Sequence, residues 1–271
     1  MVSMSNQLAL HTSTLDTTPL AEGLRVARDT GWDAVELRRV DFDRAEAAGQ
    51  SEHDVLELVR HSQLAVSAVG VAAGWMFAVG DERAHLLDRF TRSCFAASAL
   101  DCPIVMSAVD RARGDLRQAA DSVRQVGDLA TQYGVRIALE FNSQAAQFNS
   151  LDAVRELLAL ADHSGCGLLL DTYHLQRTGR GGRGFTEVTP QELTYFQYSD
   201  VPREGLQPGV TNDRLPPGEG VVDWAAVFGL LAEKCYGGPL SYEAVNSVAW
   251  TRDPAAVARQ GLLATRAALS Q

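Results

Sequence analysis

Short apolar segments alternate with amphipathic segments along the whole chain of 271 residues. An amphipathic stretch with the pattern of a helix follows each apolar segment. This strict alternation is typical of parallel β/α units, whose strands are buried on both faces and are apolar throughout. The predicted strands span Leu8–Ser13, Asp33–Arg38, Leu64–Val71, Pro103–Val109, Val135–Asn142, Cys166–His174, Thr194–Asp200 and Pro239–Val245.

The number of β/α units favours a closed barrel over an open sheet. The repeat occurs eight times without interruption, and eight parallel strands, each followed by a helix, form a barrel of about 250 residues. We therefore expect residues 1–271 to form a single (β/α)8 TIM barrel domain. A doubly wound open sheet is the alternative.

The unit between the sixth and seventh predicted strands is irregular. The segment LQRTGRGGRGFTEVTPQEL, residues 175–193, has too little helical pattern for a full outer helix. We therefore expect a shortened or irregular sixth helix. The glycine-rich, basic RTGRGGRG stretch is interpreted as a flexible connection, and a lid that recruits an anionic group is the alternative.

The composition limits the class of ligand. With 34 acidic and 24 basic side chains, the net charge is −10, which disfavours a protein that grips nucleic acid along its phosphates. No apolar run approaches the ~18 residues of a membrane helix. The four cysteines are spaced singly, without the pairs of a zinc or redox motif. We expect a cytoplasmic enzyme for a small molecule, without nucleic-acid or membrane partners, and homo-oligomerisation stays open.

Polar residues recur near the ends of the last four predicted strands. They are Glu140, Asp171, Gln197 and Glu243. Charged groups in buried strands are costly unless they are paired, bound to metal or open to solvent. The C-terminal ends of barrel strands carry the active site, and neighbouring strands lie about 4.8 Å apart. Three carboxylates and an amide oxygen suit Mn²⁺ or Mg²⁺, so we predict one divalent ion. The alternative is that each carboxylate only ends a strand or pairs with an arginine.

Five segments in the second half carry a family resemblance. In chain order, IALEFN, LLLDTYHL, FQYSD, NDRLPPGEGVVDW and LSYEAV resemble the sugar phosphate isomerase/epimerase-like superfamily, also called the xylose isomerase-like TIM barrel. This superfamily includes inosose isomerases and dehydratases and ketose 3-epimerases. The resemblance covers essentially the whole chain, and D-x-x-H followed by D-R-x-x-P-G-x-G is its most specific part.

The resemblance implies roles for the residues that match the family motifs. Glu140 and Glu243 match two glutamate ligands that also exchange substrate protons, and Asp171 matches an aspartate ligand. His174 matches the histidine three residues after that aspartate, and Arg214 matches the arginine before the P-G-x-G turn. These five residues are therefore expected to form the core of the site.

Gln197 departs from the family pattern. The usual fourth ligand of the family is a histidine, and an amide oxygen binds borderline metals less well than imidazole does. The chain also resembles the bacterial 3-dehydroshikimate dehydratases of this superfamily, some of which carry glutamine at this position. We therefore expect Gln197 to be a neutral oxygen ligand.

Residues of the first half are weaker candidates for the mouth of the barrel. His11 on the first strand, and Glu36 and Arg38 on the second, are candidate substrate-binding residues. Trp75, after the third strand, could form an apolar wall of the pocket, and loop packing is its alternative. The P-P-G-E-G turn after the seventh strand is interpreted as a structural turn that positions Arg214, in preference to a phosphate-binding site.

The residues and the resemblance together predict a metal-dependent isomerase or epimerase. The substrate would be a keto-sugar or keto-cyclitol, a polyhydroxy ketone that reacts through an enediolate with paired glutamates as acid and base. If a β-hydroxyl leaves after proton abstraction, the same residues perform dehydration, as in a lyase of the 3-dehydroshikimate or inosose type. A non-catalytic or partner-dependent subunit is a further alternative.

Overall fold

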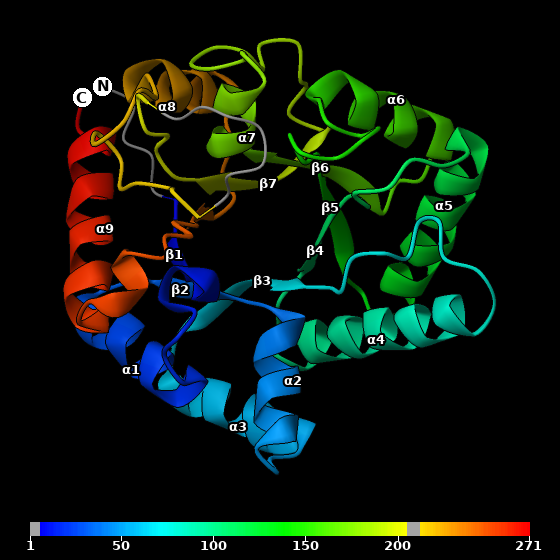
Figure 1. Ribbon diagram of the computed structural model, residues 1–271, viewed down its shortest axis with the longest axis horizontal. Helices are drawn as coiled ribbons and strands as arrows, with labels where there is room; N and C mark the ends of the chain where they lie inside the picture. The colour runs from blue at the N-terminus through cyan, green and yellow to red at the C-terminus, as the bar shows by residue number, and fades with distance from the viewer. Residues whose placement is uncertain (1–5, 205–211) are drawn as a thin grey trace.

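The strands form a closed parallel barrel in the order of the sequence (Figure 1). The computed structural model describes residues 6–204 and 212–271. The strands are β1 (Leu8–His11), β2 (Ala34–Leu37), β3 (Ala65–Gly70), β4 (Ile104–Ala108), β5 (Arg136–Glu140), β6 (Cys166–Asp171), β7 (Leu193–Tyr198) and β8 (Leu240–Tyr242). β8 pairs in parallel with β1, which closes the ring. The predicted (β/α)8 barrel is therefore confirmed.

Helices surround this barrel (Figure 1). They are α1 (Leu20–Thr30), α2 (Arg39–Ala47), α3 (Glu52–Ser62), α4 (Gly80–Ala99), α5 (Leu116–Gln132), α6 (Leu151–Ala161), α7 (Thr172–Arg177), α8 (Trp224–Glu233) and α9 (Pro254–Leu269), with short 3₁₀ helices η1 (Thr12–Leu15) and η2 (Ala249–Thr251). The last helix, α9, packs beside α1 and closes the outer ring. Among the described residues, no helix has both the length and the apolar character needed to cross a membrane.

Two helices, α7 and α2, differ from the predicted positions of helices and strands. β6 ends at Asp171, whose side chain accepts a hydrogen bond from the backbone N–H of Tyr173 and so caps α7. His174 therefore lies on a helix and not on the predicted strand. The second unit contains an additional helix, α2, which starts directly after β2, where the carboxylate of Asp41 accepts a hydrogen bond from the backbone N–H of Arg38.

The sixth unit has the predicted irregularity. Its helix α7 has 6 residues, and turns follow it. The arginines of the basic stretch already have acidic partners: Arg180 pairs with Asp152 and Glu187, and Arg183 pairs with Glu233. Because these cations are paired at the surface, the structure favours the flexible connection over a lid that recruits an anion.

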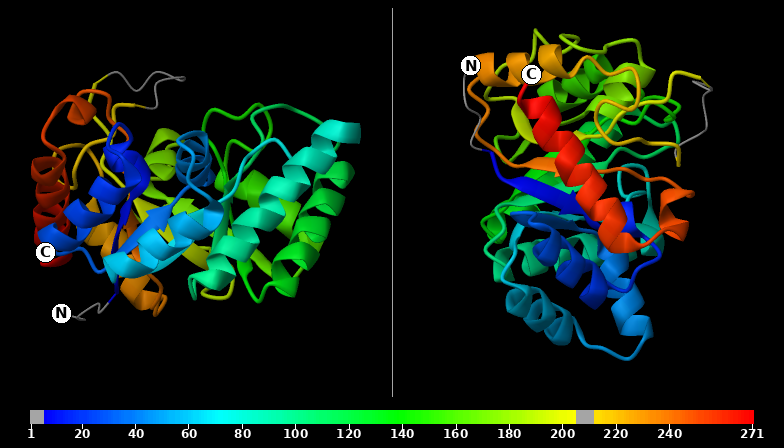
Figure 2. Two further views of the ribbon diagram at one scale, coloured as in Figure 1. Left: turned by 90° about the horizontal axis from the view of Figure 1, so that it is seen from below. Right: turned by 90° about the vertical axis from the view of Figure 1, so that its left-hand side faces the viewer.

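The barrel interior separates into an apolar lower part and a polar upper end. An inner cluster of buried side chains fills the barrel, and it consists of Ala68, Ile104, Ala138, Leu169 and Tyr195. A larger apolar cluster lies between the strands and the helices. In the side view of Figure 2 (left), the segments after β7 and β8, yellow and orange, lie at the same end of the barrel. This is the end at which the polar side chains of the strands converge.

Candidate active site

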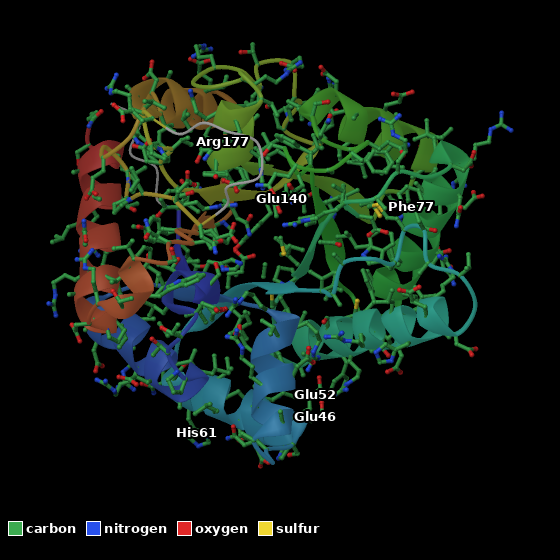
Figure 3. All side chains as sticks on the ribbon, in the orientation of Figure 1. Glu46, Glu52, His61, Phe77, Glu140 and Arg177 are labelled. Carbon is green, nitrogen blue, oxygen red and sulfur yellow. The ribbon has the colours of Figure 1, made fainter. Side chains whose placement is uncertain are left out.

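The polar residues predicted for the last four strands lie at the upper end of the barrel. Glu140 and Asp171 are the last residues of β5 and β6, and Glu243 directly follows β8. Gln197, the penultimate residue of β7, pairs with Asp171 in the register of the two strands. Figure 3 shows Glu140 near the middle of the barrel, whereas Glu46, Glu52 and His61 lie on the outer helices.

Two oxygens of this group have no hydrogen-bond partner among the described residues. They are Oε1 of Glu140 and Oε1 of Gln197, and both are buried. A buried polar atom without a partner is costly, so such an atom marks a position that an ion, a water molecule or a ligand can satisfy. The donors available here are carboxylate and amide oxygens, which fit a hard divalent cation. The residues present are therefore compatible with the predicted ion.

His174 completes a compact cluster with two of the carboxylates. Glu140, Asp171 and His174 each offer a ligand atom, and these atoms lie within 4.8 Å of one another. The backbone N–H of Ser143 donates to Nδ1 of His174, which leaves the proton of the neutral ring on Nε2. Nε2 lies 3.5 Å from Oε1 of Glu140. Burial lowers the pKa of His174 to about 4, so the ring is neutral near pH 7. In this tautomer Nε2 carries the proton and can donate a hydrogen bond.

Arg214 connects the other two carboxylates. Its Nη1 donates to Oδ2 of Asp171 at 2.7 Å and to Oε2 of Glu243 at 2.8 Å. The guanidinium carbon lies 4.5 Å from the centre of the Tyr173 ring, which fixes the plane of the group. The Nε atom of Arg214 is buried and has no partner among the described residues. Arg214 therefore lies among the carboxylates at the upper end of the barrel, with its Nε–H still available.

The two glutamates of the site are difficult to ionise in the absence of a cation. Burial raises the pKa of Glu140 well above its usual value, and the neighbouring charges of Asp171 and Glu243 raise it further. Burial also raises the pKa of Glu243, although Arg214 opposes this shift. A cation bound among these groups would favour their ionised forms, and protons and metal would therefore compete for the site.

The first-half candidates His11 and Glu36 lie beside and beneath these residues. Nε2 of His11 is 3.5 Å from Oε1 of Glu36 and 3.7 Å from Oε1 of Glu243. Both side chains are buried, and burial lowers the pKa of His11 to about 3 and raises that of Glu36 to about 8. Glu36 also accepts a hydrogen bond from Nε2 of Gln197 at 2.8 Å. Glu36 therefore binds neighbouring protein groups and does not reach the mouth of the barrel. Its predicted role in substrate binding would require it to do so.

Arg38 has structural partners in place of the expected contact with substrate. Its guanidinium donates to Thr12, Asp16 and Asp41, which ties the start of α2 to η1. The sequence could not show this arrangement, because two of the partners lie on the segment after β1.

Trp75 is also a core residue and not a wall of the pocket. Its side chain is fully buried, and the indole N–H donates to Oγ of Ser107 at 3.0 Å. The ring packs edge-to-face against Phe90 of α4, with the centroids 5.9 Å apart. The loop-packing alternative therefore holds for this tryptophan.

Asp200 organises the turn that carries Arg214, and sequence reasoning did not single it out. Its carboxylate accepts from the backbone N–H groups of Gly218 and Val222 and from the indole N–H of Trp224. A Cβ atom at Gly220 would lie 2.3 Å from Oδ1 of Asp200, so the turn requires glycine there. Because Asp200 already binds N–H groups of the turn, the structure favours the structural turn over a phosphate site. An acidic residue after a buried strand was the available signal.

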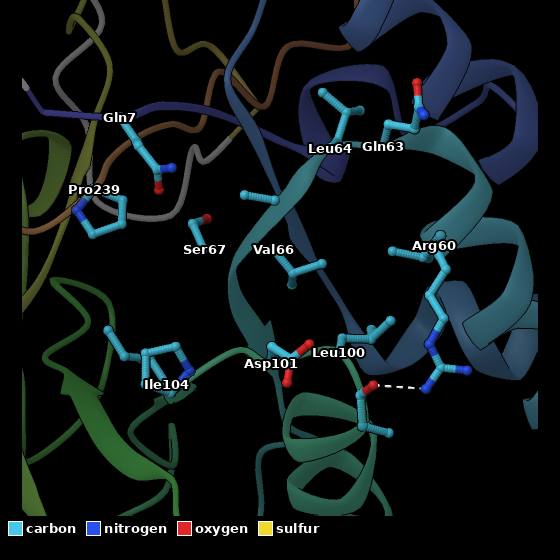
Figure 4. A pocket seen from close by; sticks show the side chains of 14 residues that line it. Gln7, Arg60, Gln63, Leu64, Val66, Ser67, Leu100, Asp101, Ile104 and Pro239 are labelled. Atoms are coloured by element: carbon cyan, nitrogen blue, oxygen red, sulfur yellow. Dashed lines mark hydrogen bonds between the residues drawn. The ribbon is translucent and has the colours of Figure 1, made fainter.

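One hollow lies among the loops at the upper end of the barrel, and another lies at the far end. The first has a volume of about 520 Å³ and is lined by residues that include Phe77, Asp110, Arg111 and Asn142, which follow β3, β4 and β5. The second has a volume of about 650 Å³ and lies at the N-terminal ends of the strands (Figure 4). Its lining includes no pair of carboxylates, and Arg60 there donates to the backbone oxygen of Ala99. The upper end is therefore the candidate active site.

The chain is similar to curated enzymes of two kinds. The chain is 27% identical over 252 residues to a 3-dehydroshikimate dehydratase of Pseudomonas putida, a match that covers 90% of this chain and 39% of that protein. It is 22% identical over 241 residues to an inosose isomerase of Halalkalibacterium halodurans, covering 85% of this chain and 84% of that protein. Thus the chain spans well under half the length of the curated dehydratases it matches.

The fold and the family follow from two further comparisons. A crystal structure of the IolI protein with a bound zinc atom superposes with a TM-score of 0.85 at 20% identity, covering 97% of this chain and 98% of that one. The model of the xylose isomerase-like TIM barrel family matches residues 24–268. The chain therefore belongs to the xylose isomerase-like TIM barrel family.

Proposed function

We propose that this protein is a metal-dependent dehydratase of a small polyhydroxy ketone, of the 3-dehydroshikimate type. Glu140, Asp171, Gln197 and Glu243 would hold one Mn²⁺ or Mg²⁺ per chain. The observation that carries the proposal is the pair of unpartnered buried oxygens, Oε1 of Glu140 and Oε1 of Gln197, at the strand ends that also carry Asp171 and Glu243. When bound, the cation supplies Lewis acidity, which makes a C–H bond next to a carbonyl more acidic.

The side chains of this chain can then divide the proton transfers. Glu140 removes the proton from the carbon beside the ketone, since its Oε1 has no partner among the described residues. The C–O bond to the β-hydroxyl breaks, and the proton on Glu140 passes to the leaving oxygen. The products are water and a conjugated ketone, and the Glu140 carboxylate is regenerated.

Two further residues would bind the reacting molecule. His174 presents its Nε2–H beside Glu140, and a neutral imidazole can donate a hydrogen bond to an oxygen that gains negative charge. Arg214 is held by Asp171 and Glu243 and keeps its Nε–H available for a substrate oxygen. The planar guanidinium would therefore orient the substrate while the glutamate handles protons.

Two points support dehydration over isomerisation. A dehydratase relative matches 90% of this chain. In addition, the resemblance to 3-dehydroshikimate dehydratases implies a glutamine ligand at the position of Gln197. With 3-dehydroshikimate as substrate, loss of water and enolisation would yield an aromatic dihydroxybenzoate. The single-domain organisation, cytoplasmic location, possible homo-oligomer and lack of nucleic-acid or membrane partners remain part of the proposal.

Isomerisation or epimerisation is the second candidate. The inosose isomerase relative matches this chain over 84% of its own length, whereas the dehydratase matches over 39%. In that reaction Glu140 would remove a proton and Glu243 would return one to another carbon or face. The same residues would serve both reactions, so the substrate would decide between them.

The test is incubation of the Mn²⁺-loaded protein in D₂O with 3-dehydroshikimate, an inosose and a ketose, separately. A dehydratase produces an aromatic absorbance from 3-dehydroshikimate and incorporates no deuterium into recovered inosose or ketose. Deuterium in the recovered ketone without loss of water supports the isomerase. If neither product forms and the protein holds less than a tenth of an ion per chain, the result supports the non-catalytic or partner-dependent subunit.

A further inference from the structure

The two ends of the Gln197 amide have different surroundings. Its nitrogen Nε2 donates to Oε1 of Glu36 at 2.8 Å, whereas its oxygen Oε1 is buried without a partner among the described residues. Only the oxygen of an amide can bind a cation, because the nitrogen has no lone pair available. We propose that Glu36 is a positioning residue that fixes the Gln197 amide with its oxygen toward the cation. This inference rests on the metal site of the proposed function.

Oε1 of Glu36 is the hydrogen-bond acceptor in this contact. Two N–H groups face this atom: Nε2 of Gln197 at 2.8 Å and Nε2 of His11 at 3.5 Å. The proton of neutral His11 lies on Nε2, because the backbone N–H of Ser13 donates to Nδ1 at 3.0 Å. Oε1 therefore accepts the hydrogen bond of Gln197, and a proton on that oxygen would oppose this contact.

The other oxygen of Glu36 belongs to a chain of hydroxyl groups. Oε2 lies 3.1 Å from the hydroxyl of Tyr195, which lies 2.7 Å from Oγ of Ser67. Ser67 also reaches the backbone oxygen of Val35 at 3.2 Å. If Glu36 is ionised, Tyr195 donates to Oε2; if Oε2 is protonated, it donates to Tyr195, Tyr195 to Ser67, and Ser67 to Val35. In both arrangements Oε1 stays an acceptor, so the orientation of Gln197 does not depend on the ionisation of Glu36.

A flipped amide would be unfavourable at both ends. It would place the oxygen of Gln197 against Oε1 of Glu36, so that two acceptors meet in a buried site without a proton between them. It would also turn an N–H₂ group toward the cation. The contact with Glu36 therefore stabilises the one orientation in which Gln197 can act as a ligand, as partners behind metal ligands commonly do.

The experiment measures Mn²⁺ affinity by the electron paramagnetic resonance signal of free Mn²⁺, in wild type and variants of the full chain. Glu36→Met removes the acceptor at similar side-chain length, and Glu36→Gln retains an acceptor oxygen but not the charge. We expect Glu36→Met to weaken binding by about 10- to 100-fold. Glu36→Gln should stay within about 3-fold of wild type. Ser67→Ala, at the far end of the hydroxyl chain, is the control and should change the affinity by less than about 2-fold.

The same substitution in a Gln197→Ala protein shows whether Glu36 acts on Mn²⁺ affinity by positioning Gln197 or directly through its charge. In a Gln197→Ala protein, Glu36→Met should weaken Mn²⁺ binding by less than about 2-fold further, because the residue it acts through is gone. Equal losses for Glu36→Met and Glu36→Gln, or an equal loss in both backgrounds, would overturn the proposal while the metal site stands. If Glu36→Met does not fold, Glu36→Asp replaces it, since it keeps the charge but shortens the reach. Retained affinity in Glu36→Asp would then contradict positioning. A wild-type protein that binds no Mn²⁺ would instead contradict the proposed function, and this inference with it.

Discussion

The two halves of the barrel bury polar side chains at the same end but leave them in different states. In the second half, Glu140 and Gln197 each keep one buried oxygen without a partner among the described residues. In the first half, both oxygens of Glu36 have hydrogen-bonding neighbours, and His11 is held by Ser13. Burial of a polar group at a strand end therefore does not by itself identify a ligand. Within the described part of the second half, Glu140 and Gln197 each have an oxygen free to take a further ligand, whereas Asp171 and Glu243 share oxygens with Arg214.

The largest expected effect is the loss of turnover when a second-half glutamate becomes neutral. Glu140→Gln and Glu243→Gln remove a ligand charge and a proton acceptor together, so we expect kcat/KM to fall by roughly 10²–10⁴. Steady-state kinetics at saturating Mn²⁺ checks this, with Glu233→Gln at the surface as control. A tenfold fall in kcat/KM corresponds to about 1.4 kcal/mol. If either site variant keeps more than about a tenth of the wild-type kcat/KM, the second half of the barrel does not differ from the first in the way proposed.

The next effect concerns Arg214, which joins two second-half carboxylates. A lysine has no Nε–H to offer the substrate, and its ammonium cannot stack on Tyr173 as the planar guanidinium does. Arg214→Lys should lower kcat/KM by about 10- to 100-fold. The control is Arg183→Lys, at the surface, which should leave the kinetics unchanged. Unchanged kinetics for Arg214→Lys with a lowered Tm would show that the arginine only stabilises the turn.

A smaller effect is expected in metal preference at Gln197. In Gln197→His, one ring nitrogen can donate to Glu36 while the other faces the cation. Imidazole favours borderline metals, so the preference should shift toward Co²⁺ or Zn²⁺ by about tenfold relative to Mn²⁺. Competition titrations with each pair of ions measure this shift. An unchanged order of affinities would remove Gln197 from the ligands.

The smallest expected effect is the contribution of Glu36 to the pH dependence of stability. Its pKa is raised from 4.5 to about 8 by burial, so the folded protein binds an extra proton between these values and loses stability as the pH rises through them. Metal-free wild type should therefore lose stability relative to Glu36→Gln between pH 5 and 8, by at most about 1.4 kcal/mol per pH unit. Urea unfolding of both proteins at the two pH values gives the difference. A constant difference would show that the pKa of Glu36 is the same in the folded and the unfolded protein.

The sequence predicts what depends on a repeated local pattern. Alternating apolar segments predicted the barrel, and the acidic residues at strand ends predicted Glu140, Asp171 and Glu243 at its upper end. Patterns within one segment could not show partners from distant segments, which is why Arg38 and Trp75 were expected at the mouth. The strand predicted through His174 ends at Asp171 because a side-chain cap starts a helix there. The tautomers of His11 and His174 likewise depend on backbone N–H groups whose positions only the fold sets.

The anomalous diffraction of a crystal soaked in Mn²⁺ tests the central claim most directly. The account predicts one peak at the upper end of the barrel, within about 2.0–2.6 Å of oxygens of Glu140, Asp171, Gln197 and Glu243, as for hard cations bound by oxygen. It also predicts that Glu36 contacts Gln197 and not the ion. No peak at this end, or a peak bound by Glu36 and His11 in place of the second-half oxygens, would contradict the account.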